Sequence, residues 1–203
     1  MNFNDVVKKR RAVREYTPAA IERSEVEALI NAAIEAPSAM NLQPWAFAVI
    51  LDREQIDRYA RRAQNWLSAN LSQLGSSETQ HRFEQRMLED PDFTLFYHAP
   101  ALVLVMAKSP DAQAAQDCCL AAQNLMLAAR DHELGTCWIG FARPWLNLPA
   151  IKAELGLPDR YQVVAAIVLG HPKVWPESHG RKPAEVRWIG SVQAKQSPLM
   201  TVS

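Results

Sequence analysis

The first half of the chain contains two stretches in which apolar residues recur every three or four positions. After Thr17-Pro18, one stretch predicts a helix that ends before Pro37, with an apolar face formed by Val26, Leu29, Ile30, Ala33 and Ile34. Ser24 and Glu27 have the spacing of a capping box for its first turn. The second predicted helix runs from Arg53 to about Leu74, with one side formed by Ile56, Tyr59, Ala63, Trp66, Leu67 and Leu71. A short helix is also expected over residues 3–11.

Two further helices are predicted in the second half. The longer one covers residues 111–132, and Gly135 follows it. Its middle, CCLAAQNLMLAA, is apolar almost all round, so we expect this helix to lie in the core. A shorter helix is expected around residues 149–155, closed by Gly156.

Three aliphatic runs are too short for helices and predict buried strands: WAFAVILD at 45–52, APALVLVMAK at 99–108 and YQVVAAIVLG at 161–170. Together the elements predict an α+β fold in which helices enclose a small sheet and one helix is central. The length of 203 residues suits a single domain, residues 1–203.

Charge and composition narrow the possible functions. The 22 Lys and Arg balance the 22 Asp and Glu, so nucleic-acid binding is the weaker interpretation and the basic excess is local, in RRAVREY at 10–16. No run of 18 apolar residues predicts a membrane span. The three cysteines and five histidines show neither a disulfide framework nor metal-ligand spacing. We therefore expect a cytoplasmic protein without a metal site, and we interpret Cys118 and Cys119 as core residues of the long helix.

Several polar residues are candidates for ligand binding, and each has a purely structural alternative. Arg10, Arg11 and Arg14 could form a solvated helix face, although Arg10 and Arg14, four residues apart, would share one side of a helix. Asn41, close to a proline, could simply complete a turn. The sequence contains neither GxGxxG nor a Walker A motif, so a nucleotide-like cofactor would need side-chain cations and scattered backbone donors.

The order of these segments resembles the nitroreductase family of FMN-dependent oxidoreductases. RRAVREY comes first, followed by APSAMNLQPWAFAVI at 36–50, APALVLV at 99–105, LGTCWIGF at 134–141, GHP at 170–172 and GRKP at 180–183. The early RRxxR and the PSxxNxQPWxF are the most specific parts, and the resemblance covers nearly the whole chain. It implies a small, mostly antiparallel central sheet flanked by helices, with FMN at the interface of a homodimer.

The resemblance also implies which cations hold the flavin. Arg10 and Arg11 would approach its phosphate and ribityl end. Arg14 would reach the pyrimidine edge, where a fixed cation stabilises the reduced flavin. Near the C-terminus, Arg181 would bind the phosphate, and His179 would supply a second cation.

Further contacts are implied on both sides of the flavin. The partner chain would contribute three residues: Pro37, Ser38 and Asn41. One face of the ring would be lined by Trp138, Ile139 and Gly140. The N–H of Gly140 would donate to N5, since a glycine permits close approach. Ala12 and Ala39 stand where the family commonly has serine.

The implied activity is hydride transfer from NAD(P)H through flavin N5 to a small electrophilic acceptor, such as a nitroaromatic or a quinone, in ping-pong order. No catalytic acid or nucleophile is required, because the protein positions the reactants and tunes the flavin. Residues 65–98 are expected to form a lid and specificity segment, with aromatic residues Trp66, Phe93 and Phe96. Residues 174–203 are expected to pack on the dimer partner.

Two alternative functions stay open. One is a specialised relative on the same fold, either a reductive dehalogenase or a flavin-degrading enzyme. The other is a regulator that binds flavin or nucleic acid without turnover, against which the even charge balance counts.

Overall fold

The computed structural model describes residues 1–74 and 78–189. Its four strands form one sheet in the order β1-β2-β4-β3, with every neighbouring pair antiparallel. Their bounds are Trp45–Ile50 for β1, Ala101–Ala107 for β2, Gly135–Trp138 for β3 and Gln162–Gly170 for β4. Central strands β2 and β4 are almost entirely buried, as their unbroken aliphatic runs require.

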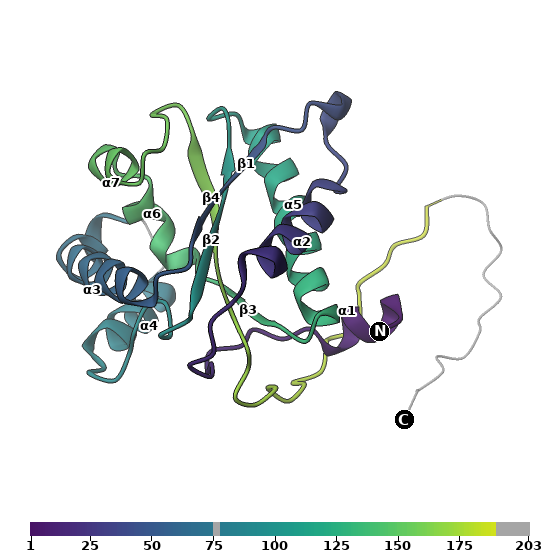
Figure 1. The fold of residues 1–203 in the computed structure, drawn as a ribbon, viewed down its shortest axis with the longest axis horizontal. Coiled ribbons are helices and arrows are strands. Elements are labelled where there is room, and N and C mark those ends of the chain that lie inside the picture. Colours follow the sequence, from purple (N-terminus) through teal and green to yellow (C-terminus); the bar gives the residue numbers. More distant parts are fainter. Residues whose placement is uncertain (75–77, 190–203) are drawn as a thin grey trace.

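Helices cover both faces of this sheet (Figure 1). On one face lie α2 (Arg23–Ile34) and α5 (Ala112–Asp131), and on the other lie α3 (Arg53–Asn70), α6 (Arg143–Leu146) and α7 (Pro149–Glu154). Helix α1 (Phe3–Lys9) packs by α5, and α4 (Glu78–Glu89) follows α3. The apolar core is correspondingly divided into two clusters, one on each side of the sheet. The predicted α+β fold is confirmed.

Strand β3 was not predicted from the sequence. Its four residues pair with β4 from Gly135↔Gly170 to Trp138↔Ile167 and form one edge of the sheet. Gly135 is required by close packing, because a Cβ there would lie 2.8 Å from the Cβ of Val13. A run this short, containing a glycine, carries too little periodicity to be separated from a loop.

Helix α5 departs from the expectation of a helix buried on all sides. One side packs on the sheet and is fully buried at Cys118, Ala121 and Leu125. The opposite side is open, with Leu120 46% exposed and Cys119 exposed as well. The interpretation of Cys119 as a core residue is therefore wrong for the single chain, whereas that of Cys118 is confirmed.

Two local predictions are corrected by the packing. Helix α2 begins at Arg23, and its capping box joins Glu22 to Glu25, because the Glu22 N–H donates to Glu25 Oε2 at 2.8 Å. The predicted Ser24 and Glu27 pair therefore lies two residues too far inside the helix to cap it. In the proposed lid segment, Phe96 is fully buried in the core and cannot contact a ligand.

Candidate functional site

The segment that follows α1 is extended and runs beside β3. Arg10 ends the helix with extended dihedral angles, φ −60° and ψ 129°. The Val13 N–H donates to the Thr136 carbonyl at 2.9 Å, and the Val13 side chain is fully buried. Because side chains alternate along an extended chain, Arg10 and Arg14 leave it on the side opposite Val13. The expectation that Arg10 and Arg14 share a helix face is therefore wrong. Burial raises the pKa of the Cys137 thiol, and the charges of Arg14 and Arg10 nearby partly offset that rise.

Positive charge accumulates around Arg10. The pKa of its guanidinium is lowered, first by burial and then by the charges of Arg181 and Arg11. Arginine keeps its proton at neutral pH, so these cations repel one another at short range. An anion placed between Arg10 and Arg181 would remove the repulsion. Arg10 and Arg181, which are far apart in the sequence, are thus near enough for their charges to act on each other.

Arg11 and Ala12 are engaged by neighbouring parts of the chain. Nη1 of Arg11 donates to the carbonyls of Lys8 at 2.6 Å and Arg10 at 2.7 Å, which satisfies acceptors at the end of α1. Its Nε is buried and has no hydrogen-bond partner among the described residues. Ala12 forms an isolated parallel bridge with Thr136. Arg11 therefore adds charge near Arg10 but is partly engaged by its own helix.

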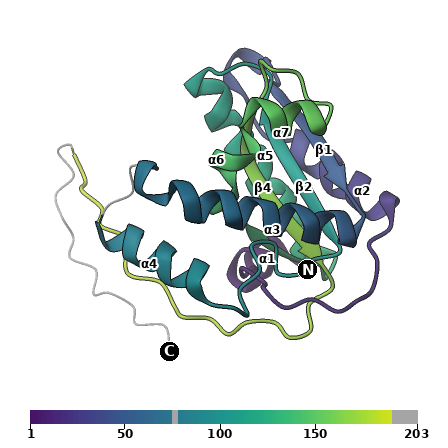
Figure 2. The same ribbon diagram turned by 90° about the vertical axis from the view of Figure 1, so that its left-hand side faces the viewer.

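Arg181 and His179 lie on the segment 171–189, which follows β4 without regular secondary structure. Figure 2 shows this segment passing beneath the body of the molecule, and in Figure 1 it runs out past α1, away from α4. It is anchored near its start, where the Arg130 guanidinium lies 3.8 Å from the centre of the Trp175 ring. Both His179 and Arg181 are exposed, so their side chains are accessible to a ligand.

A cavity of about 430 Å³ opens beside the arginines at the end of β3. Trp138 is half-buried, Ile139 is buried and Gly140 is exposed, and all three line the cavity together with Arg14. Gly140 begins a 3-10 turn, so its N–H is a donor that the turn itself leaves without a partner. A Cβ on Gly140 would meet nothing within 4 Å, which leaves room for a flat ligand against the backbone.

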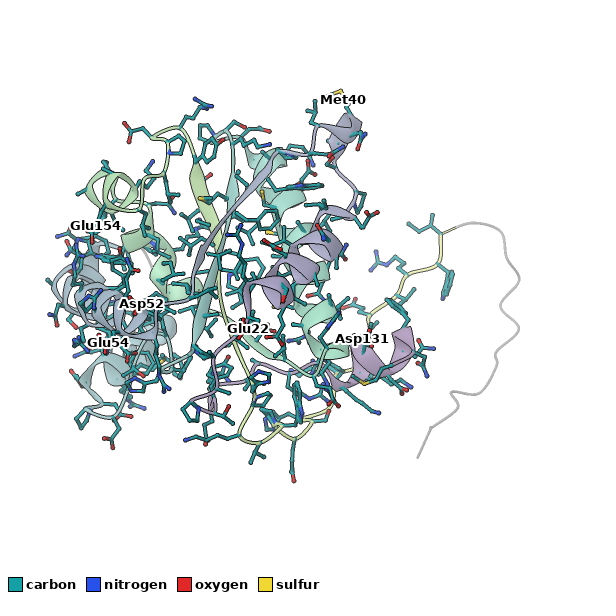
Figure 3. The ribbon with its side chains drawn as sticks, in the orientation of Figure 1. Glu22, Met40, Asp52, Glu54, Asp131 and Glu154 are labelled. Atoms are coloured by element: carbon teal, nitrogen blue, oxygen red, sulfur yellow. The ribbon has the colours of Figure 1, made fainter. Side chains whose placement is uncertain are left out.

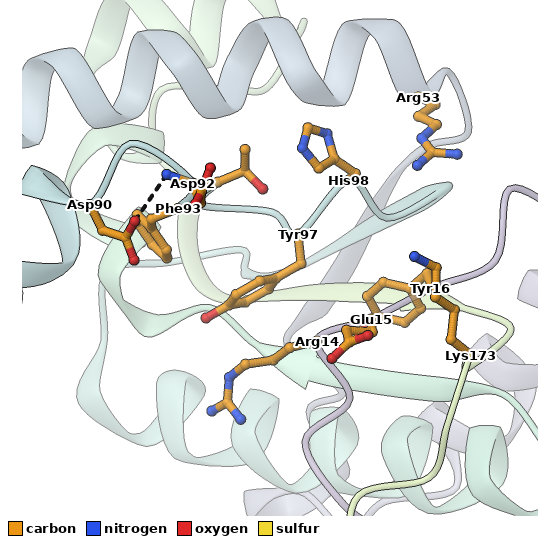
Figure 4. A pocket seen from close by; sticks show the side chains of 11 residues that line it. Arg14, Glu15, Tyr16, Arg53, Asp90, Asp92, Phe93, Tyr97, His98 and Lys173 are labelled. Atoms are coloured by element: carbon orange, nitrogen blue, oxygen red, sulfur yellow. Dashed lines mark hydrogen bonds between the residues drawn. The ribbon is translucent and has the colours of Figure 1, made fainter.

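Several residues that line this cavity, most of them aromatic, were not predicted from the sequence. Phe83 and Met87 come from α4, Phe141 follows Gly140, and Tyr97 comes from the turn before β2. Phe93, noted earlier as an aromatic of the 65–98 segment, also lines the cavity. Figure 4 shows Tyr97 above Arg14, with the phenol and the guanidinium directed to the same side. Nothing in the spacing of Tyr97 along the chain connects it with Arg14.

Ser38 and Asn41, which the resemblance assigns to the partner's flavin site, lie in the turn after α2. Ser38 Oγ accepts the N–H of Gln43 at 3.0 Å, and Asn41 Oδ1 accepts from the Gln43 side chain at 3.0 Å. The Ala39 N–H donates to Asp117 near the start of α5 at 3.2 Å. This turn, which begins after the exposed Pro37, contains residues with positive φ at 40, 41 and 43.

The turn and the arginines are at opposite ends of α5. The N-terminal ammonium group pairs with Asp131, which fixes α1 at the C-terminal end of that helix. Asp117 and Asp131 are about 20 Å apart along the helix axis, at ~1.5 Å per residue. Figure 3 shows Met40 and Asp131 far from each other. One chain therefore does not bring Ser38 and Asn41 to Arg10 and Arg14.

The described residues show neither a membrane-spanning helix nor a cluster of metal ligands. Within residues 1–74 and 78–189, no helix combines the length and apolarity needed to cross a bilayer. In the same residues, no three His, Cys, Asp or Glu side chains gather as potential metal ligands.

Known proteins resemble this chain over most of its length. Residues 7–171 match the profile described as the nitroreductase family. A protein of Archaeoglobus fulgidus, provisionally named an NADH dehydrogenase/NAD(P)H nitroreductase, is 30% identical over 81% of this chain and 82% of its own length. The iodotyrosine deiodinase of Thermotoga neapolitana is 26% identical over 91% of this chain and 96% of its own length.

A solved structure has the same fold. The nitroreductase with bound FMN from Bacteroides fragilis superimposes with a TM-score of 0.77 over 94% of this chain and all of that chain, at 23% identity. The family match spans more than half of the sequence and includes both the arginine segment and the end of β3. The chain belongs to the nitroreductase family.

Proposed function

We propose that this protein is an FMN-dependent oxidoreductase that uses NAD(P)H to reduce small electrophilic acceptors such as nitroaromatics or quinones. The observation that carries the proposal is an aromatic cavity lined by Arg14 and Gly140, close to which the charges of Arg10 and Arg181 act on each other. Membership of the nitroreductase family and the reductase name of the Archaeoglobus relative support it.

The residues present fit FMN in charge and in shape. The FMN phosphate is a dianion, and charge-assisted bonds to arginine are the strong kind. The charge of Arg181 lowers the pKa of Arg10, and a bound anion would offset this effect. The open space over Gly140 and the aromatic lining around it suit a flat ring system. Arg10, Arg11 and Arg181 would hold the phosphate and ribityl end, with His179 as a further cation.

When bound, FMN supplies two-electron chemistry, by which hydride from NAD(P)H is passed on to the acceptor. The protein contributes position and electrostatics. Arg14, at the cavity wall, would place a fixed positive charge at the pyrimidine edge. The Gly140 N–H would donate a hydrogen bond at the reactive edge, while Trp138 and Ile139 would form one wall.

We further propose that the site is completed by a second chain. The open side of α5, with Cys119 and Leu120, would form the centre of a dimer interface. Pairing two α5 helices in opposite directions would place the partner's Ser38 and Asn41 at the arginine end of this chain, with the partner's Pro37 beside them. The extension 174–203 would pack on the partner, since its exposed residues Trp188 and Ile189 cover nothing in their own chain. Residues 190–203 lie outside the described residues.

The segment 65–98 would act as the lid over the acceptor. Its helix α4 brings Phe83 and Met87 to the cavity, and Phe93 follows at the turn. Trp66 is half-buried on α3 and belongs to the packing of the lid base. These side chains would select acceptors by shape.

A second candidate is a specialised reductive dehalogenase. The observation that favours it is the nearly full-length match to an iodotyrosine deiodinase. The two candidates separate in one assay, because NAD(P)H consumption with nitroaromatics and quinones supports the first, and halide release from a halogenated phenol supports the second.

Flavin binding by arginine variants tests the proposal. Arg10→Ala and Arg181→Ala should each weaken FMN binding about 10- to 100-fold, since a bond to a charged group contributes ~1.5–3 kcal/mol. The melting temperature should change little. Quenching of flavin fluorescence measures the dissociation constant, and Arg58→Ala, an exposed arginine of α3, is the matched control. Wild-type affinity in both site variants would contradict the phosphate assignment.

A further inference from the structure

The turn 93–98 has an unusual backbone immediately before β2. Tyr97 and His98 have φ of 52° and 50°, so two consecutive residues with full side chains adopt the left-handed region. Such residues are strained, and they persist only where the surroundings hold them. The turn closes through the Tyr97 N–H, which donates to Thr94 at 3.0 Å.

Helix α3 holds this turn from two positions. Gln64 accepts the Leu95 N–H at 3.3 Å and donates to the Phe93 carbonyl at 2.9 Å. Two helical turns earlier, Asp57 Oδ1 lies 3.0 Å from His98 Nδ1. The fully buried Phe96 anchors the turn to the core between these two points. The strained conformation is therefore fixed by three independent contacts.

The result of this conformation is the direction of the Tyr97 side chain. The Arg14 guanidinium lies 5.9 Å from the centre of its ring, and Phe93 packs edge-on at 6.1 Å and 79°. Burial raises the pKa of the Tyr97 phenol, and Arg14 opposes that rise. In Figure 4 the Tyr97 hydroxyl and the Arg14 guanidinium point in the same general direction.

Tyr97 also lines two cavities. The cavity by Gly140 and a second one of about 390 Å³, lined by Arg53 and Lys173, share three residues: Arg14, Phe93 and Tyr97. Arg14 is a long, exposed side chain that makes no ion pair within the described part of the chain. Without a neighbour to fix it, such a side chain would sample both cavities.

We propose that Tyr97 is a positioning residue, held in place by α3, that keeps the Arg14 guanidinium in the cavity beside Gly140. The proposal rests on the proposed function, in which Arg14 faces the pyrimidine edge of FMN. Tyr97 touches Arg14 and acts through it.

A double-mutant cycle tests this role. Tyr97→Phe keeps the ring and removes the hydroxyl, so FMN affinity should fall about tenfold or less, and the midpoint potential of bound flavin should become more negative. In an Arg14→Ala background the same substitution should change neither quantity, because its effect passes through Arg14. Tyr161→Phe, on a half-buried tyrosine before β4, is the matched control and should resemble wild type in both backgrounds.

A second variant addresses the support from α3. Gln64→Ala should shift the flavin potential in the same direction as Tyr97→Phe, again only when Arg14 is present. Thermal unfolding of each apo variant separates this effect from loss of the fold.

The outcomes distinguish the inference from the proposed function. Equal effects of Tyr97→Phe with and without Arg14, or wild-type affinity and potential in Tyr97→Phe, overturn the role of Tyr97 while FMN binding stands. A wild-type chain that binds no FMN overturns both.

Discussion

Two glycines of this protein have different roles, one in packing of the fold and the other in the proposed ligand site. Gly135 and Gly140 lie five residues apart around the end of β3 and have opposite surroundings. A Cβ on Gly135 would lie 2.8 Å from Val13 and 2.9 Å from Pro172, whereas a Cβ on Gly140 would meet nothing within 4 Å. The first glycine is therefore required by the packed chain, and the second leaves open space in which a ligand could lie against the backbone.

Alanine substitutions at these two positions should have contrasting effects. Gly135→Ala should lower the free energy of unfolding by ~1–3 kcal/mol, because overpacking must displace the segment beside β3. Gly140→Ala should leave the melting temperature unchanged and weaken FMN binding. Thermal unfolding of the apo-protein and FMN titration measure the two quantities. A Gly140→Ala variant with wild-type FMN affinity would show that no ligand approaches this backbone.

Elements with sustained periodicity were predictable from the sequence, and short or irregular ones were not. The amphipathic pattern of α3 and the aliphatic runs of β2 and β4 identify these elements because packing against a sheet imposes such patterns. Strand β3 has only four residues and no comparable pattern. The order of motifs predicted Arg10, Arg14 and Gly140 as candidate site residues, and the structure places Arg14 and Gly140 at one cavity. Tyr97, by contrast, depends on a turn geometry that no local pattern encodes.

The ion pair between α3 and α7 predicts how the stability of the fold depends on pH. Arg62 Nη1 and Nη2 donate to the two Glu154 oxygens at 2.6 and 2.7 Å, and this bond lowers the pKa of the carboxyl. A lowered pKa contributes stability above the ordinary pKa of glutamate and loses it as pH falls through the lowered value. Both side chains are about half exposed, so the pair contributes at most ~1 kcal/mol.

Glu154→Gln should therefore lower the melting temperature slightly at neutral pH. Well below pH ~4 the wild-type carboxyl is protonated too, and the two proteins should unfold at the same temperature. Thermal unfolding across this range is the measurement. A difference that persists at acid pH would mean that the contact acts through packing alone.

At the scale of the whole molecule, apolar side chains are exposed on α5 and on the segments near its two ends. They come from α1, from the turn after α2 and from α5, and include Phe3, Val7, Met40, Leu42 and Leu120. Clusters of exposed apolar side chains are typical of an interface between subunits. The separation of Ser38 and Asn41 from the arginines has the same explanation, since a second chain would unite them. The account thus makes the dimer a condition of cofactor binding.

Complementation between two variants is the most direct test of this claim. One variant carries Ser38→Ala and Asn41→Ala, and the other carries Arg10→Ala and Arg181→Ala. Each homodimer should bind FMN weakly, because every site lacks one half of its ligands. Mixed under conditions of subunit exchange, they should form a heterodimer in which one site combines the intact arginines of one chain with the intact turn of the other. The account predicts that tight FMN binding returns on mixing; no recovery, or tight binding by the turn variant alone, would contradict it.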